Sequence, residues 1–258
     1  QWLTRQGEDF AATVTDVTSG YAQFNIHGPL ARDLLQAATT ADMSNSAFPF
    51  RTAREIDLGF ARALCVRITY VGELGYELYI PTEQAVHAYE RLCEVGQQVQ
   101  LVHCGLKALA SLRMEKGYRD FGHDIDNTDS VLEVGLGFAV AWDKASDFIG
   151  REAALEQKKS GPLHRRLVQV KLLDPLPLLY HGEILLRNGE VVGYVRAGSY
   201  GHTLGGAVGL AMVDATEPIT ADYLAAGTWE VEVAGLKVPA TTSLRPMYDP
   251  ANKKVTGG

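Results

Sequence analysis

The first third of the chain mixes a strand-like pattern of apolar residues with a helical one. Residues 12–28 (ATVTDVTSGYAQFNIHG) are rich in valine, threonine and aromatic residues around a Ser-Gly pair, which predicts strands. The Gly-Pro pair at 28–29 then predicts a helix start, because proline is tolerated in the first helical turn. The helix continues through LARDLLQAA, where apolar residues recur at helical spacing.

Three further helices are predicted in the middle of the chain. They cover residues 83–95, residues 105–116 and part of 149–162, and the first two are each followed by a glycine that can stop a helix. The spacing places four apolar side chains of the second helix on or near one face: Leu106, Leu109, Ala110 and Met114.

Residues 60–81 predict two strands joined by a turn. The turn sequence is VGELG, in which Gly72 and Gly75 can adopt the positive φ of a tight connection. Within YVGELGYELYIP, from residue 70 to 81, two glutamates and three tyrosines lie close together.

The pattern changes after a linker near residues 158–163 (KKSGPL). From Arg166 onward, short strand-like runs are separated by turns such as Asn188-Gly189, which predicts an antiparallel barrel or sandwich. The predicted domains are therefore 1–160 and 161–258.

Composition narrows the class of protein. The 258 residues are 46% hydrophobic and 21% charged, which is typical of a globular domain, and no apolar run approaches the length of a membrane span. A net charge of -7 argues against nucleic-acid binding, and the one basic cluster, KKSGPLHRR at 158–166, is interpreted as a solvated linker. Three cysteines without CxxC spacing favour a reducing compartment, either the cytoplasm or, in a eukaryote, the mitochondrial matrix.

The common catalytic motifs are missing from the sequence. There is no dinucleotide or Walker phosphate loop, no GxSxG and no HExxH. His123 stands in the polar cluster FGHDIDNTD, 121–129, which a metal site or a turn rich in Asp and Asn would both explain, and the turn is favoured. We therefore predict no metal site.

The stretch at 70–81 allows two interpretations. In the first, Glu73 and Glu77 belong to an exposed hairpin whose acids face water. Alternatively, one carboxylate accepts two parallel hydrogen bonds from a planar ligand while a ring such as Tyr70 stacks beside it. Residue pattern alone leaves both open.

Seven motifs, in order, resemble the tetrahydrofolate-binding aminomethyltransferase family, which includes the T-protein of the glycine cleavage system and the C-terminal regions of dimethylglycine and sarcosine dehydrogenases. The residues of several motifs resemble those of the dehydrogenases more closely. The motifs are DVTSGYAQFNIHGPLARDLL, ITYVGELGYELYIP, GLKALASLRMEKGYRDFGHDID, LEVGLGFAVAWDK, DFIGREAAL, VGYVRAGSYGHTLGGAVGLAMV and LRPMYDP.

The resemblance implies an α+β, three-lobed, cloverleaf-like fold, present in part, that ends in a small antiparallel barrel. It implies tetrahydrofolate as the bound cofactor, with FAD on sequence outside this chain if the protein is a dehydrogenase. The implied partners are small-molecule folate and a flavin-binding domain or subunit, with no nucleic acid and no membrane.

The resemblance also implies site residues. Glu77 matches the glutamate that pairs with the pterin edge, Tyr70 matches a tyrosine that packs near it, and Tyr76 is taken with them as folate-binding. Arg113 is assigned mainly to structure, paired with a nearby acid, with folate contact as its lesser role. Glu73 is read as a turn or rim residue.

Two departures from the family pattern matter. Leu109 stands where the T-protein has an arginine directed toward the folate tail. The family's catalytic aspartate belongs to a segment that precedes QWLTRQGEDF, so the chain resembles an N-terminally truncated domain. The catalytic residue is thus unknown here, and the isolated chain is expected to be inactive.

Three functions follow as alternatives. The leading one is the folate-binding, one-carbon-transferring portion of a dimethylglycine or sarcosine dehydrogenase-like protein, which captures its one-carbon unit as 5,10-methylenetetrahydrofolate. The second is a stand-alone aminomethyltransferase of glycine cleavage type. The third is a non-catalytic folate-binding regulatory module. The sequence preceding Gln1 would discriminate among them.

Overall fold

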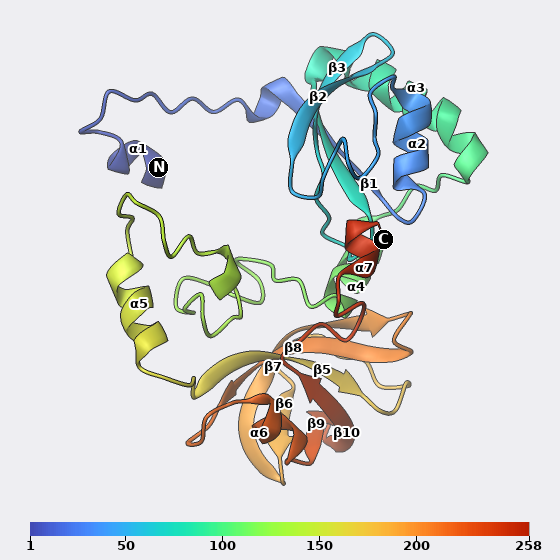
Figure 1. Ribbon diagram of the computed structural model, residues 1–258. Helices are drawn as coiled ribbons and strands as arrows, with labels where there is room; N and C mark the ends of the chain where they lie inside the picture. The colour runs from blue at the N-terminus through green and yellow to red at the C-terminus, as the bar shows by residue number, and fades with distance from the viewer. Residues whose placement is uncertain (258) are drawn as a thin grey trace. The chain divides into compact units, whose positions relative to one another are not determined.

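The computed structural model describes residues 1–257 and divides into two compact units (Figure 1). The first unit comprises residues 1–69, residues 73–103 and the last residues from Lys254. The second comprises residues 70–72 and 104–253.

A four-stranded antiparallel sheet forms the centre of the first unit, in the strand order β1-β4-β3-β2. Its strands alternate buried and exposed side chains, because a sheet with one covered face needs apolar residues only at every second position. The strand bounds are β1 Tyr21–His27, β2 Ala53–Leu58, β3 Ala61–Val66 and β4 Gly75–Pro81.

Two helices cover one face of this sheet (Figure 1). Both carry their buried residues, such as Leu34, Leu35 and Leu92, against the apolar side chains of the strands. The helices of the first unit are α1 Trp2–Gln6, α2 Ala31–Ala38 and α3 Ala85–Gly96, with 3-10 turns η1 Thr18–Gly20, η2 Thr82–Gln84 and η3 Gln97–Val99. Both predicted helices, after the Gly-Pro pair and at 83–95, are confirmed.

The structure corrects two details of the predicted strands. Residues 12–17 form no strand, and the strand begins only at Tyr21. The two strands predicted at 60–81 are present, but residues 67–74 connect them, so Tyr70 lies in the connection. Gly72 has the predicted positive φ of 76°, whereas Gly75 does not, because it already belongs to β4.

A closed six-stranded antiparallel barrel forms much of the second unit, in the strand order β10-β5-β8-β7-β6-β9 (Figure 1). The predicted α+β fold with an antiparallel barrel at the C-terminal end is therefore confirmed. Closure leaves no unpaired edge along the barrel. The bounds are β5 Arg165–Leu172, β6 Ile184–Arg187, β7 Glu190–Gly201, β8 Gly206–Asp214, β9 Trp229–Val233 and β10 Leu236–Ser243.

Residues 104–160 group with the barrel, because α4 packs on β7 and β8. The compact units therefore do not follow the predicted boundary at 160/161, which stays a prediction about family domains. The remaining helices are α4 Leu106–Glu115, η4 Gly137–Ala139, α5 Arg151–Lys159, α6 Ala221–Ala225 and α7 Lys253–Thr256. Within residues 1–257, no helix is both long and apolar enough to cross a membrane.

The buried side of α4 differs from the predicted one. Met114 is buried as expected, but Leu106 is 84% exposed. The helix buries Arg113 and Glu115 instead, because both find polar partners inside the unit. The carboxylate Oε1 of Glu115 accepts hydrogen bonds from the backbone N–H groups of Thr203 and Leu204, each at 2.7 Å.

Candidate functional site

The sheet of the first unit presents a second face that α2 and α3 do not cover, called here the open face. Along β4, Tyr76, Leu78 and Ile80 point into the core while Glu77 and Tyr79 point to the open face. Residues directly opposite in an antiparallel pair share a face, so the register extends the open face to neighbouring strands. Its other members include Tyr21, Gln23, Asn25 and His27 of β1, and Arg62, Leu64 and Val66 of β3.

Glu77 lies in the middle of this face, between Asn25 of β1 and Val66 of β3. Its side chain is half-buried, and its Oε2 accepts a hydrogen bond from the Tyr79 hydroxyl at 2.7 Å. This bond, together with the negative charge of Glu77, raises the pKa of Tyr79, because it favours the protonated hydroxyl. The contact orients the carboxylate through a neighbour on its own strand.

His27 closes one end of the open face beside Glu77. Its ring lies over Gly75, where a Cβ atom would come within 2.3 Å of the imidazole Nδ1, so a side chain at 75 would displace it. The same nitrogen is 3.3 Å from the Thr69 hydroxyl. Burial lowers the pKa of His27, and the negative charge of Glu77 acts in the opposite direction. His27 and Glu77 are thus electrostatically coupled.

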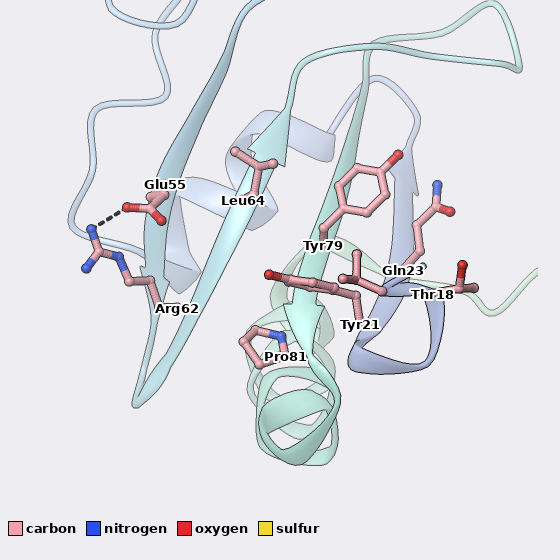
Figure 2. Close-up of a pocket in the computed structure, with 9 residues that line it drawn as sticks. Thr18, Tyr21, Gln23, Glu55, Arg62, Leu64, Tyr79 and Pro81 are labelled. Carbon is pink, nitrogen blue, oxygen red and sulfur yellow. Dashed lines mark hydrogen bonds and ion pairs between the residues drawn. The ribbon is translucent and has the colours of Figure 1, made fainter. Parts of the chain in front are cut away.

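A groove of about 590 Å³ continues the open face beyond Tyr79 (Figure 2). Figure 2 shows the side chains of Tyr21 and Tyr79, from β1 and β4, near Leu64 of β3, with an ion pair between Arg62 and Glu55 at its side. The volume is within the range of small-molecule sites. Glu77 precedes Tyr79 by two residues on β4, which separates the two Cα atoms by roughly 7 Å, and Glu77 does not line the groove itself.

Tyr76 does not share this face. Its side chain has no exposed surface, and its ring packs against Phe48 with the ring centroids 5.8 Å apart. Its hydroxyl is buried and has no hydrogen-bond partner among residues 1–257. This placement favours a packing role, and the predicted folate contact of Tyr76 stays a prediction.

Tyr70 belongs to the second unit. Its hydroxyl donates a hydrogen bond to the Arg119 carbonyl at 2.8 Å, and its ring stacks on Tyr118 with an interplanar angle of 12°. Burial raises the pKa of Tyr70 to about 12, against the opposing effect of the Arg113 charge. The structure thus fixes the ring firmly, and its predicted role beside the pterin stays a prediction.

Arg113, also in the second unit, forms the ion pair that the sequence predicts. Its Nη1 donates to both carboxylate oxygens of Asp124 at 2.9 Å and to the Tyr118 carbonyl at 3.0 Å. Both partners are buried. With its guanidinium engaged in this way, Arg113 has a structural position, and a direct folate contact stays a prediction.

The remaining candidate residues, Glu73 and His123, each lie close to a charged side chain. Glu73 lies in the connection before β4, with its carboxylate 3.7 Å from the Lys254 ammonium group. In the 121–129 cluster, the Nδ1 of His123 is 3.3 Å from Asp124, whose carboxylate already pairs with Arg113. Across the described chain, 1–257, no three His, Cys, Asp or Glu side chains are arranged to hold a metal ion.

The open face can hold a flat ligand by its edge. A carboxylate binds two parallel N–H groups strongly, and Glu77 presents a half-buried carboxylate on the open face. Sequence reasoning missed His27, Asn25 and Tyr79 as its neighbours. The strict alternation of YELYIP already indicates that Tyr79 shares a face with Glu77 and that Tyr76 does not.

Comparison with known families shows two consecutive matches. Residues 1–144 match the GCVT N-terminal domain, and residues 165–249 match the glycine cleavage T-protein C-terminal barrel domain. All six strands of the barrel lie within the second match.

Individual relatives agree with these matches. The chain is 39% identical over 256 residues to 4-methylaminobutanoate oxidase (formaldehyde-forming) from Paenarthrobacter nicotinovorans, covering 99% of this chain and 30% of the relative. It is 34% identical to mitochondrial sarcosine dehydrogenase from Mus musculus, covering 98% of this chain and 27% of the relative. The chain thus spans less than a third of these two relatives.

A solved structure shares the fold. The crystal structure of glycine cleavage system aminomethyltransferase T from Bartonella henselae superimposes with a TM-score of 0.76 at 25% identity. The alignment covers 94% of this chain and 63% of that one.

Proposed function

The chain belongs to the glycine cleavage T-protein family, and on that premise we propose that it is the tetrahydrofolate-binding, one-carbon-transferring part of a longer dehydrogenase-like protein. Two relatives support the dehydrogenase-like assignment, because each extends far beyond the region shared with this chain. In this proposal a flavin-binding region of the longer protein oxidises the amine. The region described here then binds the folate that accepts the one-carbon unit.

The placement of Glu77 is the observation that supports folate binding most strongly. A pterin presents its 2-amino group and the adjacent ring N–H as two parallel donors, and the two oxygens of one carboxylate match them. Glu77 offers such a carboxylate on the open face, and Tyr79 engages only Oε2 there. The open face also gives a flat ring room to approach.

The residues of this chain bind and orient in the proposed reaction. Bound tetrahydrofolate supplies the amine nitrogens that accept a one-carbon unit at the formaldehyde level, giving 5,10-methylenetetrahydrofolate. Glu77 would hold the pterin edge, and Tyr79 would keep its carboxylate oriented. No side chain of this chain is assigned a covalent role in the reaction. We do not propose that the 258-residue chain turns over by itself.

A stand-alone aminomethyltransferase is the second candidate. The superposition on the Bartonella henselae enzyme over 94% of this chain supports it, because the two share the fold throughout. Both candidates require the same pterin site. They differ in the longer protein, where a flavin-binding region would favour the dehydrogenase.

Calorimetric titration with 5-formyltetrahydrofolate tests folate binding directly. The unchanged chain is expected to bind, and Glu77→Gln is expected to bind roughly 10- to 100-fold more weakly, because it removes a charge-assisted pair of hydrogen bonds. Glutamine keeps the size of the side chain. A loss of affinity therefore reports the carboxylate charge.

Glu90→Gln is the matched control, since Glu90 is an exposed acid on α3, the helix that covers the opposite face of the sheet. Its affinity is expected to equal that of the unchanged chain. Equal affinity of Glu77→Gln and Glu90→Gln would remove Glu77 from the site. The absence of any folate binding by the unchanged chain would reject the proposal as a whole.

A further inference from the structure

The basic segment at 158–166 contributes two cations to a groove in the second unit. The groove has a volume of about 420 Å³ and is separate from the site proposed above. Its apolar walls include Leu132, Phe138 and Leu163, and its charged lining consists of Lys158 and Arg166. No carboxylate lines it. The segment is therefore more than the solvated linker that its sequence predicts.

Arg166 has an unusual position when compared with its neighbour Arg165. The guanidinium of Arg165 lies within 4 Å of three carboxylates, at 2.8 Å from Asp129, 3.2 Å from Glu133 and 3.5 Å from Asp214. Arg166 forms no ion pair with any described residue, and its Nη1 donates only to the Ile219 carbonyl at 3.1 Å. Successive strand residues point to opposite sides, which separates their surroundings.

The charge of Arg166 is also incompletely solvated. Its Nε–H is buried and lacks a hydrogen-bond acceptor in the part of the chain that the structure describes. Burial lowers the pKa of the Arg166 guanidinium, which reflects the cost of placing this cation away from water. An anion in the groove would relieve this cost.

Lys158 brings the second positive charge to the groove from the end of α5. Its Nζ lies 4.3 Å from the centroid of the Trp142 ring, which is itself held by a hydrogen bond from Nε1 to the Gly137 carbonyl at 2.9 Å. Within residues 1–257 Lys158 has no carboxylate partner. The aromatic face attracts the ammonium group but leaves its net charge in place.

These charges stand out in a chain with 31 acidic and 24 basic side chains. A groove with two unpaired cations and no acid has a positive local potential, which favours an anionic occupant. The apolar walls favour an occupant with an apolar body as well. A simple inorganic ion would leave those walls unused.

We propose that this groove binds a small organic anion, in which an oxyanion group is joined to a flat apolar or aromatic body. Arg166 and Lys158 hold the carboxylate or phosphate group, and Phe138, Leu132 and Leu163 contact the body. This inference concerns residues of the second unit alone. It therefore stands or falls independently of folate binding at Glu77.

Phenyl phosphate and benzoate serve as probes in a calorimetric titration of the chain, with phenol and inorganic phosphate as the two halves of the proposed ligand. Phenyl phosphate, benzoate or both are expected to saturate one site. Phenol and inorganic phosphate are each expected to bind at least about tenfold more weakly. Phenol lacks the oxyanion group, and inorganic phosphate lacks the aromatic body. The probe with the higher affinity shows whether the groove prefers a phosphate or a carboxylate.

Substitutions then locate the site. Arg166→Gln is expected to weaken binding about tenfold and Lys158→Gln about threefold, because the guanidinium is the less solvated cation. Arg166→Lys keeps the charge and is expected to retain most of the affinity, which separates a binding role from a folding role. Lys159→Gln, an adjacent lysine of α5 outside this groove, is expected to change nothing.

Three results would overturn the proposal. The first is a lack of saturable binding of both probes. The second is equal binding by all four variants, and the third is inorganic phosphate binding as tightly as phenyl phosphate. Thermal unfolding of each variant verifies that the barrel is folded before its titration is interpreted.

Discussion

Two carboxylates, one in each unit, differ in their burial and in their hydrogen-bond partners. Asp124 of the second unit is fully buried and accepts hydrogen bonds from Arg113 and from the backbone N–H of Asp120. Glu77 of the first unit is half-buried on the open face, and its Oε2 accepts from the Tyr79 hydroxyl.

The difference shows what each acid can do. The charge of Asp124 is neutralised inside the unit, so removing it would leave the buried Arg113 cation unpaired. Glu77 accepts its hydrogen bond from the neutral Tyr79 hydroxyl and forms no ion pair with a lysine or arginine among residues 1–257. In the sequence, Asp124 stands in a polar, turn-rich cluster and Glu77 in an alternating strand, and neither pattern reveals whether the charge is paired.

The largest expected effect is the loss of stability when the buried Asp124 is replaced. Asp124→Ala should lower the free energy of unfolding by about 3–5 kcal/mol, because a buried charge loses its partner. Glu77→Ala should lower it by less than about 1 kcal/mol, since it removes one partly exposed hydrogen bond. Urea unfolding measures both variants. Equal losses would mean that the two acids do not differ as described.

The next effect concerns the close approach of His27 to β4. Gly75→Ala places a Cβ atom 2.3 Å from the His27 Nδ1 and 2.9 Å from the Ile68 carbonyl, so it should cost about 1–3 kcal/mol of stability. Gly20→Ala is the control in the same unit, because nothing lies within 4 Å of its added Cβ atom. Two variants of unchanged stability in urea would contradict the observed packing of His27.

A smaller effect on the pH dependence of stability tests the electrostatic coupling between His27 and Glu77. Because the folded pKa of His27 lies below its unfolded value of about 6.5, its contribution to stability is present above that pH and is lost as the pH falls. Glu77→Gln removes the charge that raises this pKa, so the loss between pH 7.5 and pH 5.5 should be steeper in the variant. Urea midpoints at the two pH values test this. A shallower loss in Glu77→Gln would contradict the coupling.

The smallest effect is expected at the side of the groove. Glu55 and Arg62 form an ion pair whose side chains are 58% and 67% exposed, so water screens it. Glu55→Gln should change the free energy of unfolding by no more than about 0.5 kcal/mol. A larger loss in urea unfolding would show that exposure is a poor guide to the role of an acid in this molecule.

Much of the fold follows from local pattern. The helices α2 and α3 were predictable from apolar residues at helical spacing, and the barrel was predictable from short strand-like runs separated by glycine turns. The two strands at 60–81 were predictable for the same reason. The site at Glu77 came from resemblance to a family, since the pattern of residues left its role open.

The remaining details depend on tertiary partners. Leu106 fits a helical apolar face yet lies exposed, while Arg113 and Glu115 are buried because Asp124 and the backbone of residues 203–204 satisfy them. The backbone of residues 203–204 lies far along the chain from Glu115, and the spacing of apolar residues reveals neither partner. The contact of His27 with Gly75 likewise depends on the pairing of β1 with β4.

A crystal structure of this chain with 5-formyltetrahydrofolate would locate the pterin. We expect the pterin on the open face, with its 2-amino group and adjacent ring N–H about 2.7–2.9 Å from the two carboxylate oxygens of Glu77. A pterin bound elsewhere, with the Glu77 carboxylate contacting only Tyr79 as it does here, would contradict it.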